Sequence, residues 1–220
     1  MYTPAHHAFH DIKKMHGHIA EHPLGAWVCN AHSQLIANHI PFVLDAKHGS
    51  HGRLLAHVSQ ANPVWRELIE VGPSVVMFMG PSAYITPSWY PGKRQHDKVV
   101  PTWNYVTVHA HGVDRAMEDT RWILDVINRL TDTQESKRTE PWKVSDAPSA
   151  YIENMLKAVV GIEIVIERLE GRLKVSLNED EQDRLGTVEG LRRSSDASAK
   201  VLAGLVLAEL DESTRIKPGK

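Results

Sequence analysis

The sequence predicts an α+β fold, with a β-rich N-terminal part that forms a barrel or sandwich and helices that dominate the C-terminal third. Over the first two thirds of the chain, short runs of β-branched and apolar residues recur at close spacing between turn residues. Apolar and polar residues alternate over 162–168 and again over 172–178, as in half-buried strands. The stretches 180–193 and 196–211 are predicted to be helices that close the chain.

The N-terminal part begins with a helix and continues with strands. Apolar residues at positions i, i+3 and i+7 predict a helix over 9–20, which Pro23 and Gly25 end. The segment 45–52 is predicted to be a hairpin loop, and Pro63 marks the first turn of a second helix. Strands are expected over 26–30, 35–44, 54–58, 75–79, 83–86 and 99–113.

The C-terminal third mixes helices with one predicted hairpin. Helices are expected over 117–130 and from Asp146 onward. The pair Glu170-Gly171 is expected to be the turn that joins the two alternating strands. No repeat or linker interrupts the chain. We therefore expect one domain over 1–195, with a C-terminal helix and tail over 196–220 packed on the same unit.

Composition excludes several classes of protein. The 220 residues carry a formal net charge of −2, which argues against the basic footprint of strong nucleic-acid binders. The longest purely apolar run, 75–79, is far shorter than the ~20 residues of a membrane span, so no membrane association is expected. Cys29 is the only cysteine, which excludes an intrachain disulfide and a cysteine-rich zinc site. With no signal peptide at the start, a cytoplasmic protein is expected.

Histidine is the unusual residue, because eleven of the 14 histidines lie within the first 60 residues. His109 and His111 would share one strand face, as ligands on metal-binding strands do, but no further ligand stands at a recognisable spacing. We therefore expect no metal site, and we interpret His6 and His7 as surface variation. No nucleophile elbow or dinucleotide-binding motif occurs, so the sequence nominates no catalytic residue.

Three segments, 37–42, 80–91 and 98–105, concentrate tryptophan, tyrosine, proline and hydroxyl residues. A planar aromatic ligand needs such walls and a few aimed polar groups, although the same residues also suit loops that cap a barrel. The polar strand face of Arg172, Lys174, Ser176 and Asn178 has two interpretations as well. It is either a solvated face or an anion site.

Taken together, these segments resemble a known family over residues 1–195. The motifs that carry the resemblance are Ala37-Asn38-His39-Ile40-Pro41-Phe42, Pro87-Ser88-Trp89-Tyr90, Val99-Val100-Pro101-Thr102-Trp103-Asn104-Tyr105 and Lys174-x-Ser176-x-Asn178. They closely resemble the FMN-binding negative transcriptional regulators of the PaiB type, the protease-synthase-and-sporulation family. The resemblance implies an antiparallel split β-barrel of the FMN-binding type, related to pyridoxamine-phosphate oxidase, with flanking helices and a helical C-terminal tail. It also implies a homodimer with a flavin site at each side of the subunit interface.

The resemblance also nominates the residues of a flavin site. Trp89 or Trp103 would wall the ring, Thr102 and Asn104 would bind its polar edge, and Lys98 or Lys174 would neutralise the phosphate. The family pattern has an arginine where this chain has Glu179, so one cation is replaced by an acid. The full set of cofactor-binding candidates is Asn38, His39, Ser88, Trp89, Lys98, Thr102, Trp103, Asn104, Lys174, Ser176 and Asn178.

Three functions stay open at this point. The first is a homodimeric, FMN-binding transcriptional regulator. Because residues 179–220 hold 7 Lys and Arg against 9 Asp and Glu and no helix-turn-helix signature occurs, the charge favours indirect action over direct DNA binding. The second is an oxidoreductase that depends on FMN or heme, with a histidine as the heme ligand. The third is an interaction module that has lost its cofactor. The sequence does not decide whether the protein is an enzyme.

Overall fold

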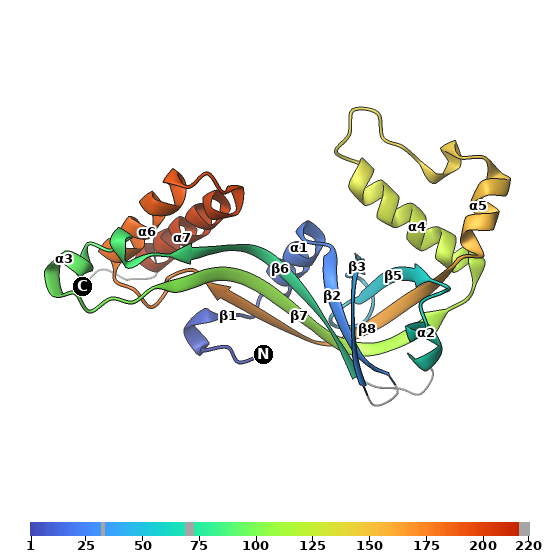
Figure 1. The fold of residues 1–220 in the computed structure, drawn as a ribbon, viewed down its shortest axis with the longest axis horizontal. Helices are drawn as coiled ribbons and strands as arrows, with labels where there is room; N and C mark the ends of the chain where they lie inside the picture. The colour runs from blue at the N-terminus through green and yellow to red at the C-terminus, as the bar shows by residue number, and fades with distance from the viewer. Residues whose placement is uncertain (32–33, 69–72, 216–220) are drawn as a thin grey trace. The chain divides into compact units, whose positions relative to one another are not determined.

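The computed structural model describes residues 1–31, 34–68 and 73–215, with side chains described up to residue 211. Its centre is an eight-stranded sheet in the order β3-β2-β6-β7-β8-β5-β4, with β1 paired to β8 (Figure 1). The chain contains both helices and an antiparallel sheet, and the predicted α+β class is confirmed. No helix within the described ranges is both long enough and apolar enough to cross a membrane.

The chain folds into two compact units, each assembled from separate stretches. Unit 1 consists of 1–10, 79–107 and 170–220, and unit 2 of 11–78 and 108–169. Three long strands contribute residues to both units: β6 (Pro73–Ile85), β7 (Thr102–Met117) and β8 (Val159–Lys174). The expected domain boundary at residue 195 stays a prediction.

Unit 2 holds most of the shorter strands. Strand β2 pairs antiparallel with β3 and β6, and β5 pairs antiparallel with β4 and β8. Residues at alternating positions of β2, such as Trp27 and Cys29, are buried, as the period of two requires. The elements are α1 (Ile12–Glu21), β2 (Leu24–Ala31), β3 (Gln34–Pro41), β4 (Val43–Asp45), β5 (Arg53–Ser59), α2 (Val64–Glu67), α4 (Thr120–Glu135), η4 (Val144–Asp146) and α5 (Ser149–Leu156).

Unit 1 is a strand layer covered on one face by two helices (Figure 1). The helices α6 (Glu181–Arg193) and α7 (Ala197–Arg215) pack against each other and bury Ile85 of β6 and Val106 of β7. Asp180 caps α6, because its side chain accepts a hydrogen bond from the backbone N–H of Asp183. The remaining elements are η1 (Ala5–His7), β1 (Ala8–Phe9), η3 (Pro87–Trp89) and α3 (Gly92–His96).

Two predicted breaks turn out to be continuous strand. The predicted hairpin turn at Glu170-Gly171 is wrong, because both residues lie inside β8. Gly171 instead allows a close approach of β1, since a Cβ there would stand 2.7 Å from the ring of Phe9. The two strands predicted over 75–79 and 83–86 are likewise one strand, β6. The described pairing of β6 with β2 runs from Val75 to Met77, so Pro81 lies outside it.

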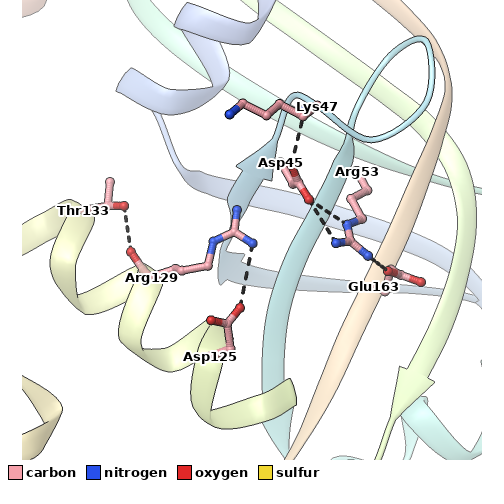
Figure 2. Close-up of polar contacts among 7 residues, drawn as sticks. All are labelled: Asp45, Lys47, Arg53, Asp125, Arg129, Thr133 and Glu163. Atoms are coloured by element: carbon pink, nitrogen blue, oxygen red, sulfur yellow. Dashed lines mark hydrogen bonds and ion pairs between the residues drawn. The ribbon is translucent and has the colours of Figure 1, made fainter. Parts of the chain in front are cut away.

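A polar cluster lies where β4, β5 and β8 run side by side in unit 2 (Figure 2). Arg53 of β5 stands between two carboxylates: its Nε and Nη2 each lie 3.0 Å from Asp45 Oδ2, and its Nη1 lies 2.7 Å from Glu163 Oε1. Glu163 is buried, so its charge depends on Arg53 for compensation. Burial alone would raise the pKa of Asp45, but hydrogen bonds from Arg53 and from the backbone of Lys47 lower it.

Replacing Arg53 with methionine is expected to destabilise the protein. The change leaves the Glu163 carboxylate buried without its cation, and the partial exposure of Arg53 keeps the expected loss near 2 kcal/mol. Urea unfolding at pH 7 measures it. The matched control is Arg129→Met on α4, whose ion pair with Asp125 is longer, at 4.0 Å, and more exposed. Equal losses in the two variants would show that the Arg53 cluster carries no special weight.

Candidate functional site

A cavity of about 280 Å³ in unit 1 gathers five of the predicted site residues. We call it the Lys174 cavity. It is bordered by the start of β7, by the end of β8 with the residues that follow, and by η1 near the N-terminus. Its lining consists of His6, His7, Val100, Pro101, Thr102, Asn104, Lys174, Ser176, Asn178 and Glu179.

Two hydrogen bonds join β7 to the end of β8 inside this cavity. The ammonium group of Lys174 donates to Thr102 Oγ1 at 2.6 Å, and the amide of Asn104 donates to Ser176 Oγ at 2.9 Å. Ser176 has a φ of 60°, a left-handed conformation that turns the chain directly after β8. The turn places its hydroxyl beside Asn104 instead of continuing the strand face expected from the alternation. The cavity thus brings together one ammonium group, two hydroxyls and an amide.

Two buried polar atoms of the cavity wall have no hydrogen-bond partner among the residues that the structure describes. They are Asn104 Oδ1 and His7 Nδ1, and both residues are almost fully buried. Buried polar atoms are normally paired, so unpaired ones in a cavity wall indicate a missing polar partner. The cavity therefore has the properties of a site for a ligand with hydroxyl or amide groups.

The electrostatics of the cavity favour an anion. The pKa of His7 is lowered to about 4. Burial is the largest cause, and repulsion from His6, Arg172 and Lys174 adds to it. His7 is therefore neutral near pH 7, while Lys174 supplies the charge. Burial also lowers the pKa of Lys174, and repulsion from the nearby Arg172 lowers it further. Positive groups this close to one another become more stable when an anion lies between them.

Glu179 is the one acid in the lining. Burial raises its pKa, and nearby acids raise it further, while a hydrogen bond from Asn178 at 2.9 Å opposes the rise. Its carboxylate offsets part of the positive charge of Lys174. The resemblance described above leads one to expect an arginine at this position, so the cavity is less cationic than that resemblance implies.

The structure places the six other candidates outside the Lys174 cavity. Ser88 and Trp89 line a separate groove against α6, and Lys98 is exposed. Trp103 is 55% exposed and makes an edge contact with Tyr84, with ring centres 6.1 Å apart. In unit 2, Asn38 and His39 lie on β3, where Asn38 accepts a hydrogen bond from Asn62 and His39 is exposed. Their roles in binding stay predictions.

The sequence interpretation missed His7. It took this residue for surface variation, but only 4% of it is exposed, and it lines the Lys174 cavity. His7 is held there because β1 pairs with β8, with Ala8 opposite Arg172. A two-residue strand leaves no periodicity to detect, so no local signal in the sequence could have found this position.

Comparisons with known proteins identify the family of the chain. A family model described as "Putative FMN-binding domain" matches residues 1–168. An uncharacterized protein of Emericella nidulans is 34% identical over 241 residues, covering 94% of this chain and 96% of the relative. Protease synthase and sporulation protein PAI 2 of Bacillus subtilis is 29% identical over 206 residues, with the same coverage of 94% and 96%.

Solved structures confirm the fold. The FAD and heme binding protein from Mycobacterium smegmatis superposes with a TM-score of 0.54 at 16% identity, covering 74% of this chain and 70% of that chain. The flavocytochrome Anf3 from Azotobacter vinelandii superposes with a TM-score of 0.56 at 13% identity, covering 81% and 74%. At these identities the likeness establishes the architecture alone. The predicted antiparallel split-barrel fold with flanking helices is confirmed.

Proposed function

Because the chain belongs to the family of FMN-binding domains, we propose that it binds FMN and holds the phosphate in the Lys174 cavity. The observation that carries this proposal is that Lys174, Thr102 and Ser176 line the same cavity, so one ammonium group and two hydroxyls border one space. Charge-assisted hydrogen bonds of this kind are the strong contacts of phosphate sites.

The size of the cavity suits one end of the cofactor. Sites that enclose a whole drug-sized ligand measure roughly 300–1,000 Å³, and this cavity is slightly smaller, at about 280 Å³. It therefore suits the phosphate and part of the ribityl chain, and the flavin ring would lie outside it. Trp103, which is 55% exposed, offers an aromatic surface in the same unit.

The proposal assigns a role in FMN binding to five residues of the cavity. Lys174 balances the phosphate charge, and the hydroxyls of Thr102 and Ser176 donate hydrogen bonds to phosphate oxygens. The unpaired Oδ1 of Asn104 accepts a hydrogen bond from a ribityl hydroxyl. His7 stays neutral and closes the cavity on the side of η1. A bound flavin supplies hydride and electron transfer.

Comparing FMN with riboflavin tests this assignment, because riboflavin has the same ring and ribityl chain without the phosphate. Flavin fluorescence is titrated with the purified protein. We expect FMN to bind at least about tenfold more tightly than riboflavin, since one charge-assisted contact contributes roughly 1.5–3 kcal/mol. Equal affinities of FMN and riboflavin would show that the phosphate does not bind in the Lys174 cavity.

Replacing Glu179 with glutamine is expected to tighten FMN binding about three- to tenfold at pH 7. The change removes the negative charge from the cavity. Glutamine has nearly the same shape as glutamate and keeps an oxygen for the hydrogen bond from Asn178. In the wild type, protonation of Glu179 removes the same charge as the pH falls, and its raised pKa moves this effect above the usual carboxyl range. The ratio of variant to wild-type affinity should therefore shrink as the pH falls from 7 toward 5. A constant ratio over that range contradicts the assignment to Glu179.

A homodimer is part of the proposal, and two exposed surfaces support it. Strand β3 lies at an edge of the sheet, and neither of its faces is fully buried within the protomer. Leu35 on β3 is 79% exposed and Leu24 on β2 is 62% exposed, which is unusual for large apolar residues on neighbouring strands. Light scattering coupled to size exclusion should give twice the mass of the 24.7 kDa chain. The variant Leu35→Lys is expected to shift that mass toward the monomer.

The biological role that we propose is ligand-responsive regulation in the cytoplasm, which the resemblance to the PaiB-type regulators implies. The net charge of −2 favours action through partners over direct binding to DNA. Gel-shift titrations of promoter DNA test this. Sequence-selective shifts that weaken with added salt would establish direct binding and contradict the indirect mode.

Oxidoreductase activity is the second candidate, favoured by the fold shared with a flavocytochrome. The FMN-loaded protein is mixed with NADPH without oxygen, and the flavin absorption band is followed. Rapid bleaching supports an enzyme, and a stable band rejects NADPH as the reductant. Absorption after addition of hemin tests the heme variant of this candidate in the same way.

A further inference from the structure

Unit 1 contains a second hollow that the flavin proposal does not use. This hollow, the α6 groove, has a volume of about 580 Å³ and lies between α6 and the segment 88–95. The volume falls within the range of small-molecule sites. Its walls include the indole of Trp89 and the side chain of Leu185, which is 45% exposed despite being apolar.

Trp89 is a fixed element of this groove. A Cβ on Gly190 would stand 2.0 Å from Cδ2 of the indole, and a Cβ on Gly186 would stand 2.1 Å from the carbonyl oxygen of Trp89. The two glycines, one turn apart on α6, therefore let the indole and its backbone lie directly on the helix. An aromatic ring held in this way loses little entropy when a planar ligand stacks on it.

The charges around the groove are unbalanced. Arg193 forms an ion pair with Glu189 at 2.8 Å, and the two charges cancel. Arg94 of α3 also lines the groove, and it has no ion-pair partner among the residues that the structure describes. The groove therefore carries one uncompensated positive charge beside an aromatic wall.

Polar groups close one side of the groove. The side-chain amide of Gln95 donates to Gln182 Oε1 at 3.2 Å, which links α3 to α6. Each amide keeps a further polar group for hydrogen bonds, and the Ser88 hydroxyl lines the same hollow. A ligand that combines a flat ring with a carboxylate fits this arrangement of an aromatic wall, a cation and neutral hydrogen-bonding groups.

We propose that the α6 groove is a binding site for a planar aromatic carboxylate of one or two rings, separate from the flavin site. The ring lies against Trp89 and Leu185, and the carboxylate pairs with Arg94. The α6 groove and the Lys174 cavity have no lining residue in common, so a ligand in the groove occupies a different space from the phosphate.

Calorimetry with two matched probes tests the proposal on the full-length protein. 2-Naphthoate carries the carboxylate, and 2-naphthamide has the same rings without the charge. We expect 2-naphthoate to bind with a dissociation constant of about 1 mM or lower and 2-naphthamide to bind roughly tenfold more weakly. Equal affinity of the two probes, or no heat from either at millimolar concentration, overturns the proposal.

Two single-charge variants complete the test. Arg94→Gln is expected to weaken 2-naphthoate about tenfold and to leave 2-naphthamide unchanged. Lys93→Gln removes the same charge from the neighbouring position of α3, which does not line the groove, and should change neither affinity by more than about twofold. The same loss in both variants would indicate general attraction to a basic surface and would contradict a site at Arg94.

Discussion

FMN binding is expected to weaken by about 10- to 100-fold when Lys174 is replaced with alanine. Lys174 is the one lysine in the cavity lining, and its ammonium group is held by Thr102 at 2.6 Å. Because the position is fixed before the ligand arrives, little entropy is lost when a phosphate takes up the contact. Losing a charged hydrogen-bonding partner costs roughly 1.5–3 kcal/mol, which corresponds to the stated factor.

Fluorescence quenching of FMN measures the change in affinity, and two controls test whether it comes from the contact between Lys174 and the phosphate. Lys98→Ala removes an equal charge from an exposed position outside the cavity and should alter the affinity by less than about twofold. Riboflavin should lose little affinity in Lys174→Ala, because it carries no phosphate. If FMN and riboflavin weaken together, the variant has damaged the fold or the ring site, and the phosphate assignment fails.

The contribution of a buried acid in unit 2 to the free energy of unfolding is expected to fall with rising pH. Asp114 of β7 and Ser74 of β6 are both almost fully buried, and the Ser74 hydroxyl donates to Asp114 Oδ1. Burial raises the pKa of Asp114 to about 6, and hydrogen bonds from Ser74 and Trp27 oppose the rise only in part.

The sign of the effect follows from this raised pKa. The folded state holds the proton of Asp114 more tightly than the unfolded state. Below the unfolded pKa of about 3.9 the acid is protonated in both states and does not lower the free energy of unfolding. Stability is lost as the pH rises from there through the folded pKa of about 6. A shift of about two pKa units corresponds to a total loss of about 3 kcal/mol, of which roughly half falls between pH 5 and 8.

Urea unfolding of the wild type and of Asp114→Asn at pH 5 and pH 8 measures this loss. The asparagine keeps an acceptor for Ser74 and cannot ionise. The variant should therefore gain about 1–2 kcal/mol relative to the wild type on going from pH 5 to pH 8. A difference between the two proteins that stays constant with pH would show that Asp114 does not titrate in this range.

The sequence predicts local order better than the paths of long strands. Short apolar runs located β2 and β5, because each strand is short and lies between clear turn residues. The same reasoning failed at Gly171, because a glycine in a turn and a glycine beneath a packed ring look alike in sequence. Only the contact with Phe9, far away along the chain, distinguishes the two cases.

The resemblance named the candidate site residues, and the tertiary structure shows which of them lie close together. No local pattern indicates that Thr102 and Lys174 share a hydrogen bond, since 72 positions separate them. His7 entered the cavity through a two-residue strand with no recognisable signature. In contrast, the resemblance nominated Asn104 and Ser176 together, and the structure places them 2.9 Å apart.

A crystal structure of the protein with FMN tests the central claim most directly. We expect the phosphate to lie within hydrogen-bonding distance of Lys174 Nζ and of the hydroxyls of Thr102 and Ser176, with a ribityl hydroxyl on Asn104 Oδ1. A phosphate bound elsewhere in the protein, with the Lys174 cavity free of ligand, would contradict it.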